Sequence, residues 1–143
     1  MTAWIALTDA SAEAGCMEVI PGSHKLGQLH HAEHAEATHN LLSRGQTITA
    51  DFDKSRTEFM PVRAGQFSLH HTHLVHNSRP NLSADRRIGL GLSYIPASVR
   101  CLSRTRLTAM LVRGTDRYGH FDDEPRPRVD FGERERAAHA DAV

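Results

Sequence analysis

The sequence lacks the features that mark secreted, membrane-spanning and nucleic-acid-binding proteins. It has two cysteines among 143 residues, Cys16 and Cys101, and their separation forms no CxxC-type pattern, which fits free thiols in a reducing cytosol. Neither sign of charge predominates, because Lys plus Arg and Asp plus Glu are 17 each. That balance removes the general electrostatic case for nucleic acid or an anionic membrane as a partner. No apolar run approaches the length of a membrane span, and the N-terminal residues do not resemble a signal peptide. We therefore expect a soluble, cytoplasmic protein.

The length and composition fit one globular domain. Hydrophobic residues make up 39% of the chain and charged residues 24%, which is globular rather than disordered. We predict a single domain over 1–143, with a core at about 3–112 and a loop-rich tail at 113–143. Histidine is the compositional anomaly, with eleven residues, and it suggests metal binding wherever the histidines are suitably placed.

Short candidate strands are separated by turn signals such as Pro21-Gly22. Alternating or β-branched patterns predict strands at Ala3–Leu7, Cys16–Ile20, Gln46–Phe52, Phe59–Arg63 and Phe67–Asn77, and another after Arg87. The last sixteen residues are charged and predict a frayed end or a loose helix. Short strands with little helix indicate an antiparallel β-sandwich or barrel.

The most informative stretch is Gly65–Tyr94, in which two candidate strands flank a polar turn. On Phe67–Asn77 the strand period of two places five residues on one face: Ser68, His70, Thr72, Leu74 and His76. Neither face is cleanly apolar, which suggests that one of them lines a polar cavity. We expect His70, His71 and His73 to be structural histidines that are satisfied by hydrogen bonds.

His76 differs from these because Arg87 follows it eleven residues later, on the other side of the turn. A neutral imidazole facing a guanidinium across a strand pair can hold a metal ion and an anionic cosubstrate side by side. Arginine suits a carboxylate because its fork binds both oxygens. Gly89 and Gly91 then indicate close approach or a bulge within the strand. On spacing alone, an ion pair at a strand end remains an alternative.

Two His-x-Glu pairs also occur, in the polar segment from Lys25 to Arg44. They are His31/Glu33 and His34/Glu36. Residues i and i+2 on a strand share a face and can both bind a metal. In a polar, alanine-rich segment, however, we expect solvent-exposed surface residues.

Four stretches resemble, in order, the phytanoyl-CoA dioxygenase family of iron(II)- and 2-oxoglutarate-dependent oxygenases. They are AWIALTDAS, AGCMEVIPGSHKLG, AGQFSLHHTHLVHNSRPNLS and RRIGLGLSYIP. Their combination is far more specific than any one of them. The resemblance implies a mainly all-β chain, folded as a double-stranded β-helix (a jelly-roll barrel) with the metal inside one mouth.

The resemblance also implies roles for four residues. His76 matches the second metal-binding histidine of the family, and Arg87 matches the arginine that binds the distal carboxylate of 2-oxoglutarate. Ser78 would add a hydroxyl to that carboxylate, and Trp4 would wall the pocket. The implied metal is Fe(II), the cosubstrate is 2-oxoglutarate, and the substrate is a small molecule.

One departure from the family pattern concerns the metal. The H-x-D motif that supplies the other two metal ligands stands upstream of the tryptophan in the family, and this chain starts three residues before Trp4. His120-Phe121-Asp122 is also H-x-D, but it comes at the wrong point in the topology. We therefore expect the C-terminal part of a longer dioxygenase, with a barrel that is incomplete at its N-terminal end. Apolar edges exposed in this way would favour self-association.

Three functions stay open on the sequence. The first is a small-molecule hydroxylase of which this chain is a fragment, inactive on its own. The second is a related non-haem iron halogenase, in which a small residue replaces the metal carboxylate. The third is a non-catalytic β-barrel remnant that binds a carboxylate through Arg87.

Overall fold

The computed structural model describes residues 1–32, 46–102 and 107–142. The chain forms two compact units, Met1–Tyr94 and Ile95–Val143. The first unit consists mainly of strands and carries all four of the site residues expected from the sequence. The second contains a pair of short strands and a helix.

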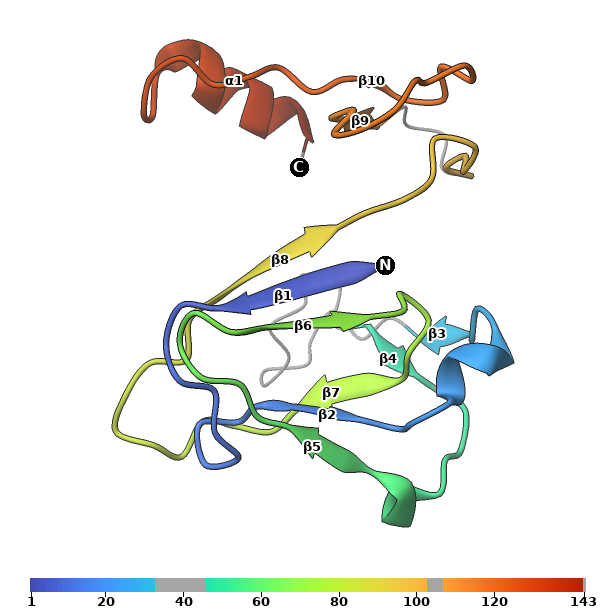
Figure 1. The fold of residues 1–143 in the computed structure, drawn as a ribbon, viewed down its shortest axis with the longest axis vertical. Helices are drawn as coiled ribbons and strands as arrows, with labels where there is room; N and C mark the ends of the chain where they lie inside the picture. The colour runs from blue at the N-terminus through green and yellow to red at the C-terminus, as the bar shows by residue number, and fades with distance from the viewer. Residues whose placement is uncertain (33–45, 103–106, 143) are drawn as a thin grey trace. The chain divides into compact units, whose positions relative to one another are not determined.

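Two antiparallel three-stranded sheets form the main part of the first unit, and Figure 1 shows them as two layers. One sheet has the order β6-β1-β8 and the other β5-β2-β7. The strands are β1 (Thr2–Ala6), β2 (Met17–Val19), β5 (Glu58–Met60), β6 (Phe67–His70), β7 (His76–Ser78) and β8 (Gly89–Ser93). From β5 to β8, successive strands alternate between the two sheets. This mainly-β, jelly-roll arrangement confirms the predicted fold class, although the strands in the described ranges do not close into a barrel.

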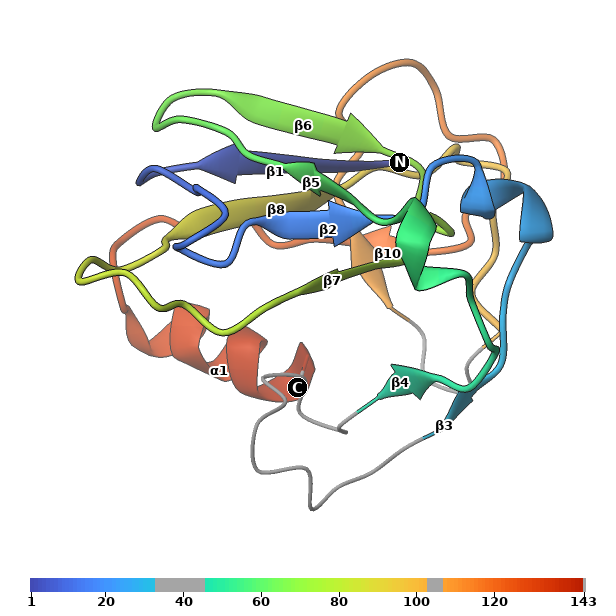
Figure 2. The same ribbon diagram turned by 90° about the horizontal axis from the view of Figure 1, so that it is seen from below.

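The remaining elements are short. In the first unit, β3 (His31–Ala32) pairs with β4 (Thr47–Ile48) to one side of the two sheets (Figure 2), and 3₁₀ turns cover Ser23–Leu26 and Lys54–Arg56. In the second unit, β9 (Thr108–Ala109) and β10 (Asp122–Asp123) are parallel, and α1 spans Glu133–Ala142. Of the two alternatives predicted for the last sixteen residues, a frayed end or a loose helix, α1 corresponds to the helix. Among the residues that the structure describes, no helix is long and apolar enough to cross a membrane.

The two faces of the β6-β1-β8 sheet differ sharply in character. Pairing register places Trp4 on the same face as Ser68 and Gly91. The opposite face carries large apolar side chains that are at least a third exposed: Phe67, Leu69, Leu90 and Leu92. The buried apolar residues are mostly small, namely Ala3, Ala6, Ala10, Ala14, Cys16 and Val19. The Trp4 face is the one with small and polar neighbours, because the β6 and β8 residues on it include Ser68, Gly89 and Gly91.

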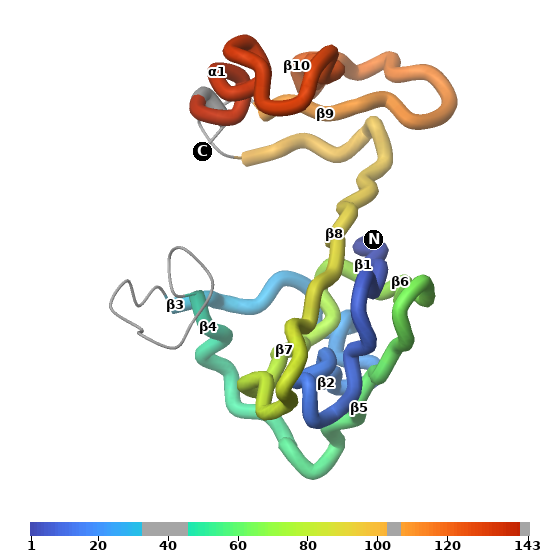
Figure 3. The backbone as a smooth tube through the Cα atoms, turned by 90° about the vertical axis from the view of Figure 1, so that its left-hand side faces the viewer, coloured from blue at the N-terminus to red at the C-terminus, as the bar shows by residue number. Residues whose placement is uncertain are grey.

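The long strand predicted at Phe67–Asn77 is wrong. The chain leaves one sheet at His70 and enters the other at His76 (Figure 3). The turn between them is closed by a 2.9 Å hydrogen bond from Leu74 N to His71 O and a 2.8 Å bond from Val75 N to Ser23 Oγ. The predicted common face therefore does not run from Ser68 to His76. His76 and Arg87 likewise do not face each other across one strand pair, because β7 and β8 belong to different sheets.

Candidate functional site

Arg87 lies just before β8, and its side chain meets residues from three other segments. Its Nη1 donates a 2.9 Å hydrogen bond to Ser78 Oγ on β7 and a 2.6 Å bond to the carbonyl oxygen of Gly15. Its Cζ is 5.7 Å from the centre of the Trp4 ring, within the range of a cation–π contact. The structure thus brings together the three residues that the sequence pointed to for carboxylate binding. Because Arg87 is only half-buried, its guanidinium remains within reach of a dissolved anion.

The indole of Trp4 is seated against the backbone of β8. A Cβ built at Gly89 would overlap the Trp4 ring, whereas one built at Gly91 would meet nothing within 4 Å. The close approach expected from the two glycines is therefore found at Gly89. The missing side chain at Gly89 leaves room for the Trp4 ring, whose centre is 5.7 Å from Arg87 Cζ.

Replacing Gly89 by alanine should consequently destabilise the fold. The added methyl must displace a half-buried indole, and overpacking of this kind costs about 1–3 kcal/mol. Urea unfolding measures the loss. Gly91→Ala is the matched control, because the position is two residues along the same strand and open, and equal losses in the two variants would contradict the packing described.

His76 opens β7 and is held in a defined tautomer. Its Nδ1 lies 2.7 Å from Leu74 O, and because a carbonyl oxygen can only accept, the proton is on Nδ1. In the neutral ring the lone pair is then on Nε2, and this is the form in which a histidine binds a metal while its other nitrogen is hydrogen-bonded to the backbone. Ser78 follows two residues later on the same strand face. His76 thus fits the role of a metal ligand beside the Arg87 and Ser78 pair.

His70, at the end of β6, is a neighbour of His76 that sequence reasoning set aside. The two ring centroids are 5.7 Å apart. Its Nδ1 is buried and has no hydrogen-bond partner among residues 1–32, 46–102 and 107–142, so within these residues the expectation of a fully satisfied histidine is wrong at this atom. Burial, with a smaller contribution from His76, lowers the pKa of His70 below its ordinary value, which favours the neutral ring.

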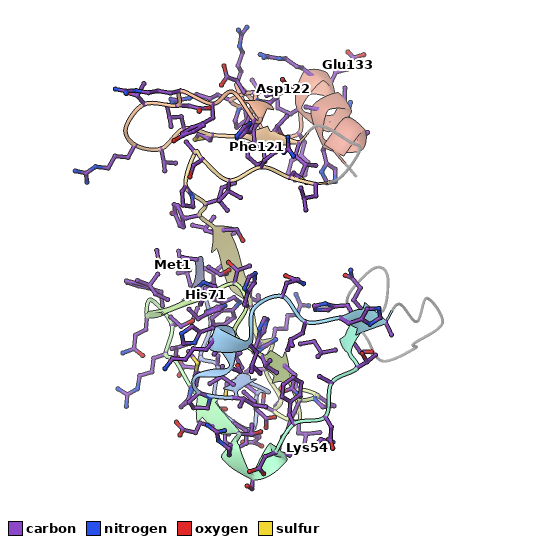
Figure 4. The ribbon with its side chains drawn as sticks, turned by 90° about the vertical axis from the view of Figure 1, so that its right-hand side faces the viewer. Met1, Lys54, His71, Phe121, Asp122 and Glu133 are labelled. Atoms are coloured by element: carbon purple, nitrogen blue, oxygen red, sulfur yellow. The ribbon has the colours of Figure 1, made fainter. Side chains whose placement is uncertain are left out.

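His71 and His73 belong to a different surface cluster. His71 Nδ1 accepts a 3.0 Å hydrogen bond from His73 N, as expected of a satisfied histidine. The His71 ring centroid lies 5.0 Å from that of His73 and 5.5 Å from that of His24. Figure 4 shows His71 near Met1, whose amino group donates to Thr72 Oγ1 at 3.2 Å.

Gly15 is a further site residue that the sequence did not reveal. It adopts a left-handed conformation with φ of 71°, and a Cβ there would overlap the carbonyl oxygen of Arg79. This conformation directs its own carbonyl oxygen to Arg87. The only sequence signal is a glycine two residues before the start of β2, which by itself indicates no more than part of a turn.

The other candidate metal pairs gain no support from the structure. His31 lies in β3, where its Nδ1 is 2.9 Å from Leu29 O. Its predicted partner and the second pair lie outside the described residues: Glu33, His34 and Glu36. His120 and Asp122 belong to the second unit. Within residues 1–32, 46–102 and 107–142, no three His, Cys, Asp or Glu side chains are grouped to hold a metal ion.

Comparison with known proteins places this chain in a family. Residues 1–89 match the model of the phytanoyl-CoA dioxygenase family (PhyH). Phytanoyl-CoA dioxygenase 1 of Oryza sativa subsp. japonica is 33% identical over an alignment of 103 residues that covers 64% of this chain and 31% of that protein. A probable alpha-ketoglutarate-dependent hypophosphite dioxygenase of Stutzerimonas stutzeri is 32% identical over 99 residues, covering 68% of this chain and 34% of that protein.

Solved structures agree with these relatives. The apo form of ThoJ, a non-heme monooxygenase, superposes with a TM-score of 0.79 at 33% identity, over 99% of this chain and 49% of that one. Its nickel complex gives a TM-score of 0.72 at 29% identity, over 99% of this chain and 47% of that one. The chain thus spans about a third of the length of its curated relatives and about half of ThoJ. On its match to the family model over most of its length, the chain belongs to the phytanoyl-CoA dioxygenase family.

Proposed function

We propose that this chain carries the cosubstrate-binding part of an iron(II)- and 2-oxoglutarate-dependent dioxygenase that acts on a small molecule. The observation that carries the proposal is the meeting of Arg87, Ser78 and Trp4, with the free Nε2 of His76 on the same strand as Ser78. The printed name of the Stutzerimonas stutzeri relative, which includes alpha-ketoglutarate dependence, and the nickel complex of ThoJ support it.

Each residue has a defined task in this proposal. Arg87 binds the distal carboxylate of 2-oxoglutarate through its guanidinium, a charge-assisted contact that favours two parallel hydrogen bonds. Ser78 Oγ, already 2.9 Å from Arg87 Nη1, turns to the same carboxylate. Trp4 covers the guanidinium and excludes water from one side of it. His76 holds the metal through Nε2.

Bound Fe(II) supplies the oxygen chemistry that is coupled to oxidation of 2-oxoglutarate, and family sites of this type use two histidines and one carboxylate. Of those three ligands, His76 is the one that this chain's geometry supports. The remaining residues described above bind and orient the cosubstrate. The proposal therefore concerns binding by this chain and oxidation of a small molecule by the whole protein.

Calorimetric titration of the chain with three related acids under anaerobic conditions, with Ni(II) as the metal, tests the proposal. 2-Oxoglutarate offers a distal carboxylate to Arg87 and a keto acid to the metal. Glutarate keeps both carboxylates but lacks the keto group, and pyruvate keeps the keto acid but lacks the distal carboxylate. We expect 2-oxoglutarate to bind at least tenfold more tightly than either, and more tightly with Ni(II) than without it. Equal affinity for all three acids would rule the proposal out.

A further inference from the structure

A buried carboxylate on β2 lies on the side of the sheet that faces away from the candidate site. Glu18 pairs with Phe59 on β5 and with Asn77 on β7, so it is on the opposite face of the sheet from His76 and Ser78. The Glu18 side chain is only 6% exposed. A buried charge is strongly destabilising unless it is paired. The carboxylate therefore needs a cationic partner.

That partner is Arg79, the residue directly after β7. Its Nε forms an ion pair with Glu18 Oε1, and its Cζ lies 5.0 Å from the centre of the Phe59 ring, which is a cation–π distance. The Arg79 side chain is 62% exposed, so water screens the pair from one side. Both contacts restrict the arginine, and they anchor the chain after β7 to β2 and β5.

The two ends of the ion pair belong to the segments that hold Arg87. Gly15 stands three residues before Glu18, and Ser78 directly before Arg79. The oxygens of Gly15 and Ser78 are the two acceptors of hydrogen bonds from Arg87 Nη1. The carbonyl oxygen of Arg79 also lies against Gly15, where an added Cβ would overlap it. The ion pair thus joins, on the far face of the sheet, the two segments that orient Arg87.

We propose that the Glu18–Arg79 ion pair positions Arg87 for the distal carboxylate of 2-oxoglutarate, by fixing the separation of the two oxygens that hold Nη1. Glu18 and Arg79 are positioning residues, because they act through the backbone and not by touching the cosubstrate. This inference rests on the cosubstrate role proposed above for Arg87. Without the ion pair the Gly15 and Ser78 segments can move apart, and the guanidinium then loses one or both of its acceptors.

Charge alone would have the opposite effect at Glu18. Burial raises the pKa of the Cys16 thiol, and among the smaller contributions Glu18 raises this pKa and Arg87 lowers it. The two charges therefore act on the same group. Removing the Glu18 carboxylate makes the surroundings of Arg87 more positive, which by itself favours a bound anion. Positioning and charge thus predict opposite changes in affinity for Glu18→Gln.

Calorimetric titration with 2-oxoglutarate, under anaerobic conditions with Ni(II), tests the inference in three variants. Glu18→Gln keeps the size of the side chain and removes its charge, and Arg79→Gln leaves the buried carboxylate unpaired. Glu18→Met/Arg79→Met removes both charges together, and apolar side chains of similar volume often replace a buried ion pair without loss of stability. We expect all three variants to bind 2-oxoglutarate about five- to tenfold more weakly than the parent chain, within the range for coupled neighbours. Arg79→Lys, which keeps the charge, should recover part of the loss.

A control variant separates positioning from a general loss of stability. Asp53→Ala removes the cap of the 3₁₀ turn at Lys54–Arg56, where Asp53 Oδ1 accepts a 3.1 Å hydrogen bond from Ser55 N. It should lower the midpoint of urea unfolding and change the affinity for 2-oxoglutarate less than about twofold, as expected for a separate site. The double methionine variant should show the reverse, with a midpoint close to that of the parent chain and weakened binding.

The results distinguish this inference from the proposed function. If Glu18→Gln or the double variant binds 2-oxoglutarate as tightly as the parent chain, or more tightly, while Arg87→Ala binds it weakly, the positioning role alone is wrong. If Arg87→Ala also binds normally, or the parent chain does not bind 2-oxoglutarate, both are refuted. Should Arg79→Gln fail to fold, Glu18→Gln and the double variant give the answer, because neither leaves an unpaired buried charge.

Discussion

Arg87→Ala is expected to reduce the affinity of the chain for 2-oxoglutarate at least 30-fold. Truncating one partner of a hydrogen-bonded charge pair costs about 2–5 kcal/mol, and the lower end applies here because Arg87 is half-exposed and screened by water. That lower end, about 2 kcal/mol, corresponds to roughly 30-fold. The affinity of Arg87→Lys for 2-oxoglutarate should lie between those of the parent chain and of Arg87→Ala. Lysine keeps the positive charge but cannot make the two parallel hydrogen bonds of a guanidinium.

The neighbouring arginine provides a matched control for charge. The Arg86 side chain is exposed, and the contact that the structure gives this residue is made by its backbone oxygen, which accepts a 2.9 Å hydrogen bond from Thr8 Oγ1. Arg86→Ala removes the same charge one residue away and keeps that bond. Calorimetry should therefore find its affinity for 2-oxoglutarate within about threefold of the parent chain. Equal losses in the two variants would mean that net charge, and not the Arg87 site, attracts the anion.

Gly15→Ala is expected to damage both stability and cosubstrate binding although Gly15 touches no ligand. Its left-handed φ of 71° is unfavourable for alanine, and the new Cβ would overlap the backbone oxygen of Arg79. The left-handed conformation costs about 1–2 kcal/mol, and the overlap adds to it because two backbone segments must separate. The shift moves the Gly15 carbonyl away from Arg87 Nη1, so affinity for 2-oxoglutarate should fall tenfold or more.

A substitution at Gly22 separates the two causes of the expected loss of stability, the left-handed backbone conformation and the steric overlap. Gly22 has a similar φ of 80°, but a Cβ there would meet nothing within 4 Å. Gly22→Ala should therefore show the conformational cost alone, about 1–2 kcal/mol in urea unfolding, with unchanged affinity for 2-oxoglutarate. If Gly15→Ala proves no worse than Gly22→Ala in both measurements, the positioning role of Gly15 is wrong.

The sequence predicts the fold class well because short, alternating strands between turn residues leave few alternatives. It fails at the break between β6 and β7. The alternating pattern continues through 71–75 without glycine or proline, and the turn is closed by Ser23, a residue 52 positions away from Val75. The local sequence pattern carries no information about a hydrogen bond to so distant a residue, and it therefore predicts one long strand.

The candidate site, like the fold, is predicted from the sequence only in part. Trp4, Ser78 and Arg87 sit in motifs that the family resemblance identifies, and the structure brings these three together. The contributions of Gly15 and His70 depend on contacts across 72 residues of chain and between two sheets. A backbone carbonyl oxygen, and a ring nitrogen without a partner among the described residues, have no signature in residue order. The sequence therefore did not single out Gly15 and left His70 as a structural histidine.

The chain contains a single tryptophan, Trp4, and it lies against the proposed carboxylate site. Fluorescence titration with 2-oxoglutarate therefore reads out the central claim directly. We predict a saturable change in Trp4 emission that disappears in Arg87→Ala and persists in Arg86→Ala. An unchanged emission spectrum at saturating 2-oxoglutarate, or the same response with and without Arg87, would contradict the account.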